Sequence, residues 1–201
     1  MDLLSEETRL FRRCVRELSP FTNEELVHMG AGVRRHTLRK RELWIDAGQI
    51  PRTVGFILSG SLRYYYTVEG TEQTSYFSVE GEWAASYTGF LRQTPSRVSI
   101  QALEDTVLLT FSYEQLSIWE QEEHFRYRIN HFLRKLAEFT IACYDDRVAA
   151  FVLQSPEERY RHLAEETDYL QRIPQQYIAN YLGITPVSLS RIRKRVAPQA
   201  S

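Results

Sequence analysis

Residues 173–196 have the sequence IPQQYIANYLGITPVSLSRIRKRV, which has the spacing of a helix-turn-helix. Ala179 falls where two such helices would cross, and its small side chain permits a close approach. Gly183 follows four residues later, where the turn requires a positive φ. Thr185 is placed to cap the second helix, and Pro186 to begin it. Four apolar residues would close the two helices on each other: Ile178, Leu182, Leu189 and Ile192.

The other side chains of the second helix are suited to DNA. Residues at three- and four-residue steps share one side of a helix, and here they are Thr185, Ser188, Arg191 and Arg195. Hydroxyl and guanidinium groups bind base edges and phosphates. Gln175 and Gln176 begin the first helix, where free backbone N–H groups could meet a phosphate. The alternative is a helical hairpin with a solvated basic face.

Charge is distributed unevenly along the chain. Residues 169–201 contain five basic side chains and no acidic one. Residues 1–168 therefore carry a net charge of −6, because the whole chain carries −1. A basic end of this kind indicates a polyanionic partner.

Composition excludes several classes of protein. The chain has 201 residues, of which 43% are hydrophobic and 25% are charged, the balance of a soluble globular protein. We find no run of the roughly 18–20 apolar residues that a membrane helix needs and no secretory signal at the acidic start, so we expect a cytoplasmic protein. Cys14 and Cys143 are too few and too far apart for a disulfide framework or a zinc finger.

Residues 33–111 have a β pattern. Short runs rich in Val, Ile, Tyr, Phe and Thr alternate with turn signals at spacings that favour an all-β roll or barrel. Residues 69–71, Glu-Gly-Thr, predict a hairpin between two strands. Helices are expected before this region, over residues 1 to about 30.

A long helix is predicted between residues 113 and 154. Six residues in it follow a 4-3-4-3-4 spacing typical of a coiled-coil seam: Phe125, Ile129, Phe132, Leu136, Phe139 and Cys143. We expect these residues to form a homodimer interface. The alternative is that the stripe packs on its own β domain. Residues 155–158, Ser-Pro-Glu-Glu, then predict the start of another helix.

Taken together, these motifs resemble the CRP/FNR superfamily of bacterial transcription regulators. The resemblance implies an α+β fold with a jelly-roll-like antiparallel β-roll flanked by helices, a long dimerisation helix and a C-terminal helix-turn-helix domain. We expect the boundaries 1–112, 113–154 and 155–201. In that family the last domain binds a near-palindromic operator as a dimer, and RNA polymerase is a further candidate partner. The family's DNA-contacting positions correspond here to Gln175, Gln176, Thr185, Ser188, Arg191 and Lys194.

This sequence departs from the family in two places near its end. Pro186 and Val187 replace the usual Arg-Glu pair, so we expect a different operator. The sequence also ends five residues after Val196, which is too soon for the usual β wing.

The resemblance places an effector pocket in the β-roll, at Gly81, Glu82 and Trp83 and at Ser96 and Arg97. The family has Arg before Ser or Thr at the second segment, whereas this chain has the order Ser-Arg. A one-residue shift in a strand turns a side chain to the opposite face, so we expect Arg97 not to meet a cyclic phosphate. The sequence leaves open a small effector other than cyclic AMP and a degenerate pocket.

The sequence lacks the residues that a metal oxygenase or an iron–sulfur protein would need. Four of the five histidines fall in expected helices, so a metal oxygenase on strands is not expected, and we predict neither an enzyme nor a metal site. An iron–sulfur cluster of the FNR type needs four cysteines, and the chain has two. The alternative to a DNA-binding regulator is a signalling or scaffold module with a degenerate pocket and no DNA binding.

Overall fold

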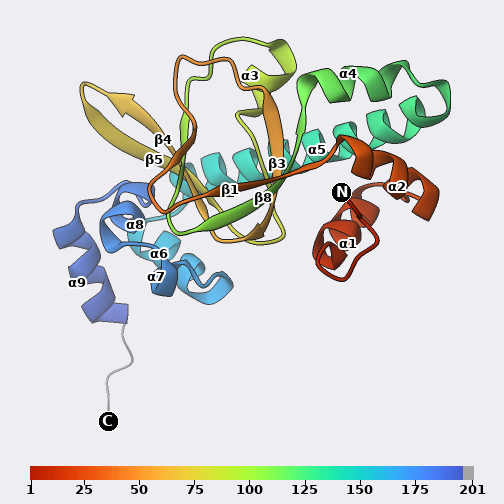
Figure 1. The fold of residues 1–201 in the computed structure, drawn as a ribbon. Helices are drawn as coiled ribbons and strands as arrows, with labels where there is room; N and C mark the ends of the chain where they lie inside the picture. Colours follow the sequence, from red (N-terminus) through yellow and green to blue (C-terminus); the bar gives the residue numbers. More distant parts are fainter. Residues whose placement is uncertain (197–201) are drawn as a thin grey trace.

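The computed structural model describes residues 1–196, and five residues of the expected last domain, 197–201, lie outside them. It has the expected α+β fold, with two four-stranded antiparallel sheets in the orders β1-β8-β3-β6 and β2-β7-β4-β5 (Figure 1). The strands are β1 (Arg34–Leu38), β2 (Leu43–Ile45), β3 (Thr53–Ser59), β4 (Leu62–Val68), β5 (Thr71–Ser78), β6 (Trp83–Ala84), β7 (Ser99–Ala102) and β8 (Thr106–Ser112). The helices are α1 (Arg9–Leu18), α2 (Asn23–Gly32), α3 (Tyr87–Arg92), α4 (Tyr113–Gln121), α5 (Glu123–Leu153), α6 (Pro156–Glu166), α7 (Tyr169–Arg172), α8 (Gln175–Tyr181) and α9 (Pro186–Val196).

The expected hairpin joins β4 to β5. Val68 pairs with Thr71, and the two residues between them, Glu69 and Gly70, both have positive φ. Two such residues make the turn whose twist matches that of a hairpin. The hairpin projects from the roll on the side of the molecule where the C-terminal helices lie, and β5 contacts α8 (Figure 1).

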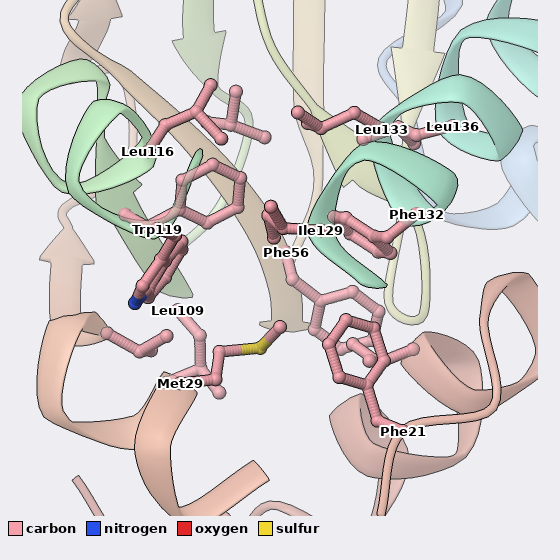
Figure 2. Packing of buried hydrophobic residues seen from close by; sticks show 14 of the residues in the cluster. Phe21, Met29, Phe56, Leu109, Leu116, Trp119, Ile129, Phe132, Leu133 and Leu136 are labelled. Carbon is pink, nitrogen blue, oxygen red and sulfur yellow. The ribbon is translucent and has the colours of Figure 1, made fainter. Parts of the chain in front are cut away.

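The main core lies between the sheet β1-β8-β3-β6 and the helices α1, α2, α4 and α5. Phe56 of β3 and Leu109 of β8 contribute from the sheet, and Trp119 of α4 and Ile129 of α5 from the helices (Figure 2). Aromatic rings meet edge to face across this layer; Trp83 lies 5.0 Å from Phe132 between ring centres. The first half of α5 is therefore held by its own chain.

This packing corrects the prediction of a dimer seam. Phe125, Ile129, Phe132 and Leu136 are buried in the core of one chain and leave nothing for a partner. The prediction was wrong for these four residues because a 4-3 apolar spacing also fits a helix that packs on a sheet, and residues of α1 and α2 complete the same core cluster. Of the other two predicted residues, Phe139 is half exposed and Cys143 is partly buried.

The C-terminal helices have a core of their own. Ala179, Leu182, Leu189 and Ile192 are buried between α8 and α9, as the spacing predicts. Gly183 has a φ of +71° in the turn between these helices. Phe77 of β5 belongs to the same cluster, so the helix-turn-helix lies directly against the β-roll.

Candidate nucleic-acid interface and effector pocket

The start of α9 is fixed by Thr185. Its side-chain oxygen accepts a hydrogen bond from the backbone N–H of Ser188 at 3.1 Å, and its hydroxyl lies 3.0 Å from the hydroxyl of Ser188. This is an N-cap, and Pro186 is the first helical residue. The local pattern predicted from the sequence is therefore present.

The outward side of α9 is basic and exposed. Arg191, Arg193 and Lys194 are exposed, and within residues 1–196 no ion pair is found for any of them. Val187 and Ser190 share this exposed surface. Neither was predicted to contact DNA, although helical spacing from Arg191 and Lys194 would have identified them.

Arg195 is not a free phosphate ligand in this structure. Its Nη2 lies 2.8 Å from Glu157 Oε2 on α6, and its Nε donates to the same oxygen at 3.0 Å. Gln175 and Gln176 are exposed at the start of α8. The seven predicted DNA-contacting residues thus all lie on the helix-turn-helix, but one of them already has a carboxylate partner.

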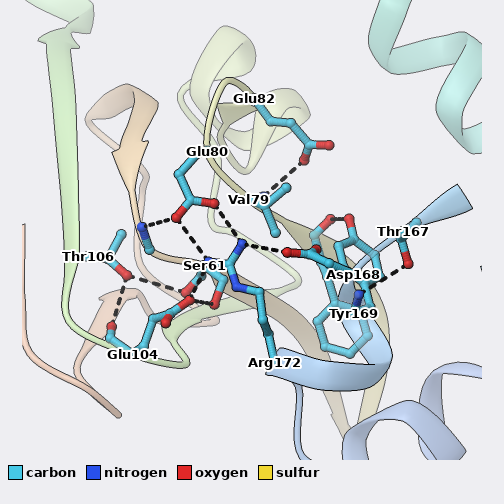
Figure 3. A network of polar contacts seen from close by, with 12 residues as sticks. Ser61, Val79, Glu80, Glu82, Glu104, Thr106, Thr167, Asp168, Tyr169 and Arg172 are labelled. Carbon is cyan, nitrogen blue, oxygen red and sulfur yellow. Dashed lines mark hydrogen bonds and ion pairs between the residues drawn. The ribbon is translucent and has the colours of Figure 1, made fainter. Parts of the chain in front are cut away.

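Arg172 connects the C-terminal helices to the β-roll (Figure 3). Its guanidinium makes two parallel contacts with Glu80, at 2.8 and 2.9 Å, and one with Glu104 at 2.7 Å. Asp168 adds a contact at 3.2 Å. The hydrogen bonds to Glu80 are the main cause of a raised pKa for Arg172. Sequence reasoning counted Arg172 toward the basic end, but three carboxylates neutralise its charge.

A second connection is made by the hairpin. Arg63 is 1% exposed, and its guanidinium lies between the rings of Tyr65 and Tyr177, 4.5 and 3.9 Å from their centres. It donates to Thr74 at 2.8 Å and to Glu72 at 2.6 Å. A buried, paired arginine of this kind fixes how α8 sits on the β4–β5 hairpin.

Glu82 and Trp83 line a small cavity of about 50 Å³ between the roll and α5. Most of the other lining groups are apolar or aromatic, and they include Tyr64, Tyr76, Leu136 and Phe139. The Glu82 carboxylate accepts a hydrogen bond from the Val79 N–H at 3.2 Å. Burial raises the pKa of this carboxyl above its usual range.

The other predicted pocket residues lie apart from Glu82. Ser96 is buried; its hydroxyl donates to the carbonyl of Val98 at 2.6 Å and lies 2.8 Å from the hydroxyl of Ser86. Arg97 is exposed and lines a neighbouring groove beside α3. Gly81 forms the turn before β6, with a φ of +87°. The structure therefore brings together Glu82 and Trp83 but does not bring Arg97 into their cavity.

One cluster was not predicted from the sequence. His28 of α2 lies 2.5 Å from Glu122, and His124 lies 3.8 Å from the same carboxylate oxygen. The three donor atoms lie within 4.8 Å of one another, so these residues could hold a metal ion. His28 and Glu122 are 94 residues apart in sequence, and no local spacing signals their approach.

Comparison with known proteins identifies the β-roll. Residues 35–118 match the cyclic nucleotide-binding domain family. FixK2 from Bradyrhizobium japonicum superposes with a TM-score of 0.72 at 18% identity, over 83% of this chain and 85% of that one. The chain has the CRP/FNR-type fold.

Two further structures share this CRP/FNR-type fold. CLP from Xanthomonas campestris, described as a c-di-GMP responsive global regulator, has a TM-score of 0.68 at 16% identity, over 87% of this chain and 91% of that one. The catabolite activator protein of Thermus thermophilus has a TM-score of 0.56 at 20% identity, over 92% and 86%. A search of curated protein sequences finds no match. Within residues 1–196, no helix combines the length and the apolar character that crossing a bilayer requires.

The partly buried carboxyl group of Glu82 should make the stability of the protein depend on pH. Because burial raises its folded pKa, the folded state binds this proton more tightly than the unfolded state does. Stability is therefore lost as the pH rises from the unfolded pKa through the folded pKa. We expect Glu82→Gln to remove this loss, so that the variant gains stability relative to the wild type as the pH is raised from 4 to 8, measured by urea unfolding. The exposed Glu123→Gln should show no such trend; an equal trend in both would contradict the assignment.

Proposed function

We propose that this chain is a sequence-specific, DNA-binding transcription regulator that acts as a homodimer, and not an enzyme. The observation that carries the proposal is the surface of α9. It presents Arg191, Arg193 and Lys194 without carboxylate partners in the described part of the chain, on a capped helix of a helix-turn-helix. Cationic side chains on an exposed helix fit the phosphates and base edges of a major groove.

The second half of α5 supports a homodimer through a different surface from the predicted one. Ile141, Tyr144 and Val148 are 61%, 49% and 62% exposed, and they continue to the exposed Phe151 and Val152. Ile141, Tyr144, Val148 and Phe151 follow a 3-4-3 spacing, which is that of a coiled-coil seam, and the core of the roll leaves them exposed. Two copies of such a helix bury identical stripes against each other, and a two-fold axis also gives the pair of recognition helices that a near-palindrome requires.

For the β-roll we propose a small effector other than cyclic AMP. The cavity beside Glu82 holds about 50 Å³ and is lined mainly by aromatic and aliphatic groups. Among the described residues, no arginine, the usual partner of a phosphate, lines it, because Arg97 lies in the adjacent groove. Glu82 and Tyr64 would supply the polar contacts, so the chemistry favours an uncharged, largely apolar molecule.

The DNA-binding proposal is tested by charge reversal on α9. We expect the wild-type protein to prefer DNA from its own upstream region over random DNA, with affinity that falls steeply as salt rises. Arg191→Glu should lower the affinity at least about tenfold, because a phosphate or base contact becomes a repulsion. Arg13→Glu, the same charge change on the exposed face of α1, is the matched control. Equal binding by Arg191→Glu and the wild type in a footprinting titration would refute the proposal.

The homodimer is tested on α5. Val148→Asp places a charge in the middle of the exposed stripe, and we expect it to convert a dimer into a folded monomer in sedimentation equilibrium. Ala142→Asp introduces the same negative charge on a different, exposed side of the helix and should leave the dimer intact. A wild-type monomer, or a dimer that survives Val148→Asp, would exclude this surface.

The effector proposal is tested by thermal unfolding with ligands. We expect cyclic AMP and cyclic GMP at millimolar concentration to leave the midpoint unchanged, whereas small uncharged aromatic compounds that bind the cavity should raise it. Glu82→Gln serves to locate the effect, because it should alter the response to any compound bound there. A rise of several degrees with either cyclic nucleotide would overturn this part of the proposal.

A further inference from the structure

A second cavity lies where the end of α5 meets the helix-turn-helix domain. Its volume is about 210 Å³, far more than one ordered water needs, and α5, α6 and the end of α8 form most of its wall. It borders the cavity beside Glu82, with which it shares Tyr76 and Cys143, but its chemistry differs. Two arginines, Arg147 and Arg159, line it.

Arg159 is one of the most buried cationic groups of the described chain. It is 9% exposed, and its guanidinium donates to the carbonyls of Gln154 at 2.5 Å and Leu182 at 3.0 Å. Its Nε is buried without a hydrogen-bond partner among residues 1–196. The carbonyls at two helix ends position this side chain, but they leave its donors incompletely satisfied.

Arg147 faces the same cavity from α5. Its guanidinium lies 3.5 Å from the centre of the Tyr181 ring and donates to the Tyr181 carbonyl. Both Arg147 and Arg159 also stack on Phe151, at 4.3 and 4.4 Å from its ring centre. The two positive charges are thus held near each other by one aromatic ring.

The charge of this pair is not balanced by any carboxylate of the described residues. Neither arginine forms an ion pair within that part of the chain, and Asp146, which also lines the cavity, is exposed to solvent. Burial lowers the pKa of Arg147, and the charge of Arg159 lowers it further. Carbonyl groups at a helix end carry only partial charges. Leaving the buried guanidinium of Arg159 and the partly buried one of Arg147 without a counter-ion is costly.

We propose that this cavity binds a small oxyanion, a carboxylate or phosphate group of a metabolite, between Arg147 and Arg159. Guanidinium groups bind both kinds of oxyanion through paired hydrogen bonds. The anion would join the end of α5 to α6 and to the end of α8, so it would fix the helix-turn-helix against the long helix. This site is separate from the β-roll pocket and does not depend on DNA binding.

The test is thermal unfolding of the full chain with inorganic phosphate or with succinate, each compared with sodium chloride at equal ionic strength. At about 100 times the dissociation constant, the bound anion should raise the unfolding midpoint by roughly 5–10 °C. Whichever of phosphate and succinate raises the midpoint more shows whether the site prefers a phosphate or a carboxylate group. Arg147→Gln should weaken binding at least about tenfold, and Arg147→Lys should retain an intermediate affinity because it keeps the charge but loses the planar fork.

Three control variants establish whether the anion response arises at this cavity. Glu82→Gln changes the β-roll pocket, Arg191→Gln the DNA-facing helix and Arg161→Gln an exposed arginine on α6, and all three should keep the full anion response. If Arg147 has only a structural role, Arg147→Gln lowers the midpoint equally with and without anion, and the proposal fails. It also fails if phosphate and succinate do no more than chloride, or if Arg191→Gln abolishes the response.

Discussion

The contact between the β4–β5 hairpin and α8 determines where the helix-turn-helix sits. Arg63 is buried between Tyr65 of the hairpin and Tyr177 of α8, with its charge balanced by Glu72. Arg172 makes an independent connection to Glu80 on the other side of the contact. Removing one partner of a buried charged contact leaves the other charge uncompensated, so these contacts favour one position of α9 relative to the roll.

Helix α5 has different roles along its length. Its first half is buried against the roll, whereas the second half exposes an apolar stripe beginning near Ile141. Tyr144 lies on the exposed stripe and also lines the cavity beside Glu82. A ligand in the roll and a second copy on the stripe would therefore contact the same side chain. Under the proposed function, binding of one changes the free energy of binding of the other, and the coupling is reciprocal.

The sequence was sufficient wherever a structural rule is local. The cap at Thr185, the positive φ at Gly183 and the hairpin at Glu69 and Gly70 each follow from neighbouring residues. The change of period along the chain separated the helical segments from the β segments, and the resemblance to the CRP/FNR superfamily then implied the α+β fold. The prediction of a dimer seam at Phe132 and its neighbours was wrong because their spacing fits a coiled coil and a helix packed on a sheet equally well. Only the position of α1 and α2 decides between the two arrangements.

In the candidate sites, too, the sequence predicted local features but not contacts between distant residues. Sequence spacing placed the exposed basic residues of α9 correctly on one helix, but it could not show that Arg172 and Arg195 have carboxylate partners more than thirty residues away. It also could not show that Arg147 of α5 lies near Arg159 of α6, because local patterns do not determine how two consecutive helices are oriented relative to each other. Long-range charge balance depends on tertiary structure. The number of basic residues near the end of a chain is therefore an upper limit on the charge available to DNA. Of the five basic residues after Asp168, only Arg191, Arg193 and Lys194 lack a carboxylate partner within residues 1–196.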